Sequence, residues 1–235
     1  MPSRGGTSDA VFRTVNLLVL LVLPGAAAGL ALWTGHLPFK LAVPGLCALI
    51  LVEAMRRDAA ARGAAIWAVV AAFGMSMVGD YFLSSRRGHS HYFEAGIAAF
   101  LVAHLGYLRY SLAHGRLDWR ALGLLLTVFV AYFGLALAPA IESRVLWAAV
   151  LAYLAVSCVG LAAAVGLEQP GRVKGLYVAG IALIVFSDTL ISFSEFLRWR
   201  ELNAWILPTY YLAHLCITAA VLLARIDHRL CAGQL

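Results

Sequence analysis

The sequence predicts an all-α fold: a polytopic membrane bundle of about eight transmembrane helices, forming a single domain over residues 1–235. Two observations lead to this prediction. Hydrophobic residues make up 63% of the chain and charged residues only 13%, whereas a soluble domain is about half apolar and about a quarter charged. Mean hydropathy is +0.86, and apolar stretches of span length use up almost the whole chain, which leaves no room for a soluble domain.

Charged residues and turns that contain Pro or Gly divide the chain into segments of about 18–25 residues, the length that crosses a bilayer core. The predicted helices are 12–34, 38–55, 64–84, 91–113, 119–138, 143–166, 173–197 and 204–225. The apolar run of the first, residues 15–35, follows Arg4 and Arg13 as in a signal peptide, but it is nearer a full span, so we interpret it as an uncleaved helix. Pro44-Gly45 interrupts the second. The short connections favour antiparallel packing of neighbouring helices.

The distribution of Lys and Arg predicts the orientation. The side that holds both termini carries twelve of the 18 basic residues, namely Arg4, Arg13, Arg56, Arg57, Arg62, Arg109, Arg116, Arg120, Arg172, Lys174, Arg225 and Arg229. The other six are Lys40, Arg86, Arg87, Arg144, Arg198 and Arg200. The positive-inside rule therefore places both termini in the cytoplasm. A composition rich in Ala, Arg and Gly is typical of GC-rich bacteria, which predicts the bacterial inner membrane. The basic residues are scattered over short loops, so a nucleic-acid partner is not expected.

Two aspartates, Asp80 and Asp188, lie inside predicted membrane helices. An ionisable residue within a span costs at least ~2.5–3.5 kcal/mol on insertion scales and is usually retained for function. The predicted topology places both in the non-cytoplasmic half, where they can face one cavity that opens outward. A pair of carboxyl groups in such a setting indicates acid–base chemistry.

The third and fourth spans resemble the seventh and eighth. Asp80 is followed 24 residues later by His104, and Asp188 is followed 26 residues later by His214. Each aspartate follows a small residue, and each histidine lies in an Ala-His-Leu triplet. Either this is chance similarity between apolar helices, or the chain contains two parallel four-helix repeats that bring two Asp–His sets to a central interface.

Further polar side chains accompany these sets. His104 and Tyr107 share a helix face with Phe93, Gly96 and Phe100, which is either a packing stripe or a cavity wall. The remaining candidates for supporting the site or binding substrate lie near the outer helix ends or around the second histidine: Glu94, Tyr210, Tyr211, His214, Arg86 and Arg87. The two arginines either clamp a lipid phosphate or extend to the interface, as helix-end arginines commonly do.

A metal site is the less favoured interpretation of the histidines. His89, His91 and Glu94 are close in sequence, but zinc sites need three or four converging ligands, and this spacing does not enforce such a set. We expect neither a metal nor another cofactor.

Several of these features, taken in order, resemble the YhhN-type lysoplasmalogenase family. They are Gly79-Asp80-x-x-Leu83, the face formed by Phe93, Gly96, Phe100, His104 and Tyr107, Phe186-Ser187-Asp188, and Thr209-Tyr210-Tyr211. One departure is Ala213-His214, where the family pattern has Ala-Gln. The resemblance implies hydrolysis of the vinyl-ether bond of a lysoplasmalogen to a fatty aldehyde and a glycerophospho-alcohol. It also implies that Asp80 and Asp188 are the essential acidic residues and that the partners are a lysophospholipid and membrane lipids.

That chemistry needs one carboxylic acid to protonate a carbon and one carboxylate to stabilise the resulting oxocarbenium ion or activate water, as in glycoside hydrolysis. We expect Asp188, the deeper and drier residue, to be the acid and Asp80 the carboxylate, with His104 and His214 orienting them or relaying protons. Two alternatives stay open: a proton- or cation-coupled transporter or lipid-binding protein that uses the same aspartates, and a metal-dependent lipid hydrolase. Headgroup preference and oligomeric state are not predicted.

Overall fold

The computed structural model describes residues 5–56 and 63–232, with side chains from residue 20 to residue 226. Throughout this part of the chain the regular structure is helical, which confirms the all-α prediction. The long helices are α1 (Gly5–Thr34), α2 (Leu37–Arg56), α3 (Ala64–Ser84), α4 (Ser90–Ala113), α5 (Trp119–Tyr132), α6 (Arg144–Val165), α7 (Gly171–Phe196) and α8 (Ile206–Ala232). Short turns of other helix types are η2 (Phe133–Leu137), η3 (Ala138–Ala140) and η4 (Asn203–Trp205).

Seven of the described helical segments are long and apolar enough to cross a bilayer, and α1 adds a shorter apolar stretch, Leu20–Thr34. The chain is therefore an integral multi-pass membrane protein. Two local expectations need correction. Pro44 does not interrupt α2, which runs through it. The fifth span reaches Ala140 only by passing from α5 into a π-turn and then a 3₁₀ turn that contains Pro139, a residue that cannot continue the α-helical hydrogen bonds.

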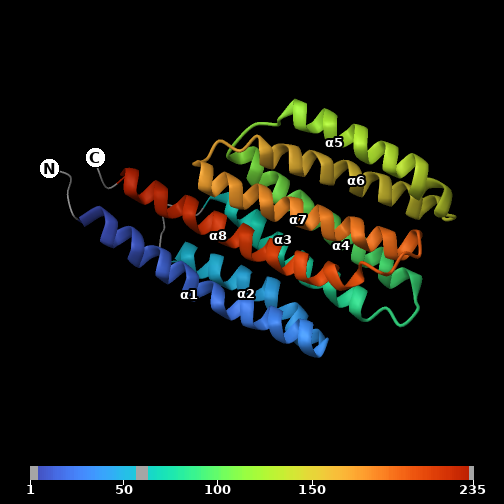
Figure 1. Cartoon of the computed structure of the whole chain (residues 1–235), viewed down its shortest axis with the longest axis horizontal. Coiled ribbons are helices and arrows are strands. Elements are labelled where there is room, and N and C mark those ends of the chain that lie inside the picture. The colour runs from blue at the N-terminus through green and yellow to red at the C-terminus, as the bar shows by residue number, and fades with distance from the viewer. Residues whose placement is uncertain (1–4, 57–62, 233–235) are drawn as a thin grey trace.

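The helices form a bundle with α3, α4, α7 and α8 in the middle, α1 and α2 on one flank and α5 and α6 on the other (Figure 1). The start of α1 and the end of α8 lie at the same end of the bundle (Figure 1). The helix contacts follow one pattern in both halves. Helix α2 packs against α3 and α8, and α6 packs against α7 and α4. Two parallel repeats would give this pattern, but similar packing does not establish common sequence units, so the repeat stays a prediction.

Glycines allow the central helices to approach closely. A Cβ atom added to Gly106 of α4 would lie 2.5 Å from the carbonyl oxygen of Ala68 in α3. On the other side of the centre, a Cβ at Gly180 of α7 would lie 2.6 Å from the Ile217 side chain of α8. These contacts bring the polar residues of α3, α4, α7 and α8 to one interface.

Candidate functional site

Asp80 lies near the C-terminal end of α3 and faces α8. The hydroxyl of Tyr210 donates a hydrogen bond to its Oδ2 atom over 3.1 Å. The residue is 8% exposed, and the Tyr210 ring packs against Phe100 of α4 at 5.9 Å between centroids. Asp80 is thus an enclosed carboxyl with one side-chain donor among the described residues.

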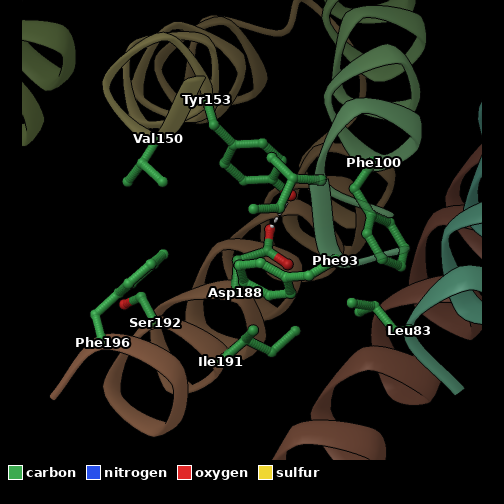
Figure 2. A pocket seen from close by; sticks show the side chains of 10 residues that line it. Leu83, Phe93, Phe100, Val150, Tyr153, Asp188, Ile191, Ser192 and Phe196 are labelled. Atoms are coloured by element: carbon green, nitrogen blue, oxygen red, sulfur yellow. Dashed lines mark hydrogen bonds between the residues drawn. The ribbon is translucent and has the colours of Figure 1, made fainter. Parts of the chain in front are cut away.

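Asp188 lies in α7 and has two close polar neighbours. Tyr153 of α6 donates its hydroxyl proton to Oδ2 over 2.8 Å (Figure 2). The Nε2 atom of His104 in α4 lies 2.9 Å from the same Oδ2 and also 2.9 Å from the Tyr153 hydroxyl oxygen. An ionised Asp188 accepts both bonds when the His104 proton is on Nε2. The result is a three-residue network from three helices that holds the carboxyl group in place.

This arrangement contradicts the Asp–His sets suggested by the sequence. His104 pairs with Asp188, although the sequence order associates it with Asp80. His214 is fully buried, and its Nδ1 is 2.9 Å from the carbonyl oxygen of Tyr210, one turn earlier in its own helix. The reason is the packing of α4 against α6: the polar face of α4 meets α6 and the adjoining part of α7, where Tyr153 completes the network.

Both aspartates line one cavity of about 420 Å³. Polar groups make up a large part of its wall. The lining residues are Lys40, Asp80, Leu83, Ser84, Phe100, Ser187, Asp188, Ile191, Asn203, Ile206, Leu207 and Tyr210. Asp188 also borders two smaller cavities, of about 70 and 60 Å³. The expectation that Asp188 is the drier carboxyl is therefore wrong, because its side chain remains 17% exposed toward these spaces while Asp80 is buried.

The 70 Å³ cavity is an apolar pocket with Asp188 among its lining residues (Figure 2). Its walls come from α3, α4, α6 and α7: Leu83, Phe93, Ile97, Phe100, Val150, Tyr153, Asp188, Ile191, Ser192 and Phe196. Asp188 is the only ionisable acid or base among these lining residues apart from the Tyr153 phenol. The pocket shares Leu83, Phe100 and Ile191 with the polar cavity, so the two spaces are neighbours that meet at one carboxyl group.

The structure does not bring every sequence candidate to this site. Tyr107 is buried against Ser76, with 3.4 Å between their hydroxyl oxygens, and it lines none of the three cavities. Tyr211 and His214 are buried beside Tyr210 without lining those cavities either. Glu94 is exposed at the start of α4.

The two arginines behave differently from each other. Arg86 pairs with Glu195 at 2.6 Å and lies 4.7 Å from the ring centroid of Phe93. Arg87 is exposed in the turn after α3, with a φ of 41°. Since neither residue lines a cavity that reaches the aspartates, the structure does not support a direct contact with them.

Tyr153 and Lys40 are the site residues that the sequence reasoning missed. Tyr153 stands in an apolar span with no motif around it, so its depth within a membrane helix was the only available signal. Lys40 was counted only for orientation, although a lysine three residues into a span was a signal that it faces a polar space. Among the described residues, no group of three or more His, Cys, Asp or Glu side chains converges as a metal site would require.

Comparison with known families gives one match. The model of the YhhN family matches residues 35–221, which covers most of the chain. No curated protein and no solved structure matches the chain.

Proposed function

The chain belongs to the YhhN family, and from this premise we propose that it is a lysoplasmalogenase-type hydrolase, since the family includes lysoplasmalogenases. Its substrate would be a lysophospholipid with a vinyl-ether chain, and its products a fatty aldehyde and a glycerophospho-alcohol. The observation that carries the proposal is the pair of carboxyl groups on one cavity, with Asp188 also lining an apolar pocket.

The two neighbouring spaces suit the two parts of such a lipid. The apolar pocket takes the first carbons of the alkenyl chain, and the rest of the chain lies in the bilayer. The polar cavity takes the glycerol and headgroup. The vinyl-ether bond, which joins these parts, then lies near Asp188.

The environments of the carboxyl groups support the opposite roles from those expected from sequence. Asp188 accepts hydrogen bonds from Tyr153 and His104, an arrangement that favours the carboxylate. Asp80 is enclosed and has one side-chain hydrogen-bond donor among the described residues, Tyr210, so it suits the protonated acid. We therefore assign proton donation to Asp80 and cation stabilisation to Asp188.

In this mechanism Asp80 transfers its proton to the double-bond carbon that does not carry the ether oxygen. This leaves an oxocarbenium ion beside the Asp188 carboxylate. Water from the polar cavity adds to the cationic carbon and gives up one proton to a carboxylate. The C–O bond of the resulting hemiacetal to the glycerol oxygen then breaks, and that oxygen takes the proton that the carboxylate received from water. The hemiacetal hydroxyl gives its own proton to Asp80, which restores the acid, and the aldehyde departs. No covalent enzyme intermediate is needed.

The test measures release of the glycerophospho-alcohol, together with any aldehyde, by purified protein from three lysolipids that differ only in the sn-1 linkage: vinyl ether, saturated ether and ester. We expect cleavage of the vinyl ether alone, because the other two do not form an oxocarbenium ion on carbon protonation. Cleavage of the ester without the vinyl ether would disprove the reaction. Binding or transport of the vinyl-ether lipid without turnover would favour the alternative of a lipid-binding protein or transporter.

A further inference from the structure

Lys40 lies in the first turn of α2 and lines the same cavity as Asp80 and Asp188. It is the only basic residue among the twelve that form this wall. Its side chain is half-buried, and the amide and hydroxyl groups of Asn203 and Ser84 belong to the same wall. The cavity thus combines two acids with one cation and several neutral polar groups.

Among the described residues Lys40 forms no ion pair with a carboxylate, although its positive charge acts on Asp80 across the cavity they share. Within the part of the chain that the structure describes, the ion pairs join Arg86 to Glu195, Arg116 to Glu168 and His104 to Asp188. The hydrogen bond to Asp80 comes from the Tyr210 hydroxyl rather than from an ammonium group. An ammonium group on a cavity wall without a bound carboxylate is available to an anionic ligand.

The other basic residues at this end of the bundle are less suitable. Arg86 is already paired with Glu195. The remaining ones are exposed and line none of the three cavities: Arg87, Arg144, Arg198 and Arg200. A phosphate bound by any of them would lie outside the space that the two aspartates share.

We propose that Lys40 binds the phosphate group of the substrate and thereby selects phospholipid over neutral vinyl-ether lipids. This inference rests on the proposed function. Only the glycerol unit separates the phosphate of a lysoplasmalogen from its vinyl-ether oxygen, so a phosphate held by Lys40 keeps the reactive bond inside the cavity of the two carboxyl groups. The lysine also offsets the repulsion that a phosphate would meet beside an ionised Asp188.

The experiment compares two substrates with the same alkenyl chain: 1-alkenylglycerophosphocholine and 1-alkenylglycerol, which lacks the phosphate. Aldehyde release is measured for the full-length wild type, Lys40→Gln and Lys40→Arg. Lys174→Gln is the matched control, because Lys174 lies at the start of α7, at the opposite end of the bundle.

We expect Lys40→Gln to lower the ratio of kcat/KM for the phospholipid to kcat/KM for the neutral lipid by about 10- to 100-fold, mainly through KM, as for the loss of a charged hydrogen bond. Lys40→Arg should keep most of the preference and Lys174→Gln all of it. If the wild type cleaves only the phospholipid, the KM for that substrate is compared instead. Lys40→Gln must then raise this KM, and Lys40→Arg must leave it unchanged.

Equal losses on both substrates would overturn the inference, because Lys40 would then act as a counterion of the carboxyl groups. An unchanged ratio would overturn it as well. Failure of the wild type to cleave either vinyl ether would instead refute the proposed function, so the two failures are distinguishable.

Discussion

At the scale of single residues, the two aspartates differ in what surrounds them. Asp188 is bonded within a network of Tyr153 and His104, while Asp80 is enclosed beside Tyr210. Paired carboxyl groups in different environments are what an acid and a carboxylate require. The sequence supplied both aspartates, His104 and Tyr210, because an ionisable or polar residue in an apolar span is conspicuous. It could not supply the pairing, which depends on the faces that separate helices turn toward each other.

Replacing either aspartate by its amide tests this division. Asp80→Asn removes the proton donor and Asp188→Asn removes the negative charge, so each should lower kcat by about 10²- to 10⁴-fold. The amide has almost the same shape, so the variants should elute and melt like the wild type. Aldehyde release is the measurement. Near-normal turnover in both variants would exclude the two-carboxyl mechanism.

Tyr153 acts through Asp188 and His104 as a positioning residue. Tyr153→Phe removes its hydroxyl bond to Asp188 and should lower kcat/KM by about 10- to 100-fold, the effect of one charge-assisted hydrogen bond. Because the Tyr153 hydroxyl donates a hydrogen bond to the Asp188 carboxylate, the pH dependence of kcat should also change. Loss of packing alone would not change it. Tyr81→Phe is the control, since Tyr81 is 46% exposed on the outer surface of α3. An unchanged activity and pH profile for Tyr153→Phe would remove it from the site.

At the scale of helices, the sequence predicted positions well and mutual arrangement poorly. The third predicted span, 64–84, coincides with α3, and 91–113 differs from α4 by one residue at its start. Span length follows from bilayer thickness, and charged or turn residues mark the ends. Contacts between helices depend instead on small residues such as Gly106. A single amino-acid sequence does not reveal which residue of α3 such a glycine will contact.

The close contact between α3 and α4 leads to a stability prediction. In Gly106→Ala the new methyl group meets the Ala68 carbonyl oxygen at 2.5 Å. Backbone cannot yield as a flexible side chain does, so we expect a destabilisation of about 1–3 kcal/mol. Gly74→Ala in α3 is the matched control, because a Cβ there meets no atom within 4 Å. Thermal unfolding in detergent is the measurement. Equal melting temperatures for the two variants would show that α3 and α4 are less tightly packed.

At the scale of the whole molecule, the site lies toward the end of the bundle opposite the termini. Lys40 is in the first turn of α2, which begins three residues after α1 ends, and α1 starts at the other end of the bundle. The cavity that both aspartates line therefore lies toward whichever side of the membrane the termini do not occupy. The excess of basic residues on the terminal side predicts that this is the non-cytoplasmic side.

Labelling of single cysteines from outside the cell tests that orientation. Glu142 is exposed in the connection before α6, and Arg172 is exposed in the first turn of α7, at the opposite end of the bundle. In a Cys231→Ser background, Glu142→Cys should react with a membrane-impermeant maleimide in intact cells, and Arg172→Cys should react only after permeabilisation. The unsubstituted background gives the contribution of the remaining cysteines. The reverse labelling pattern would show that the protein has the opposite orientation, with the two aspartates toward the cytoplasmic side.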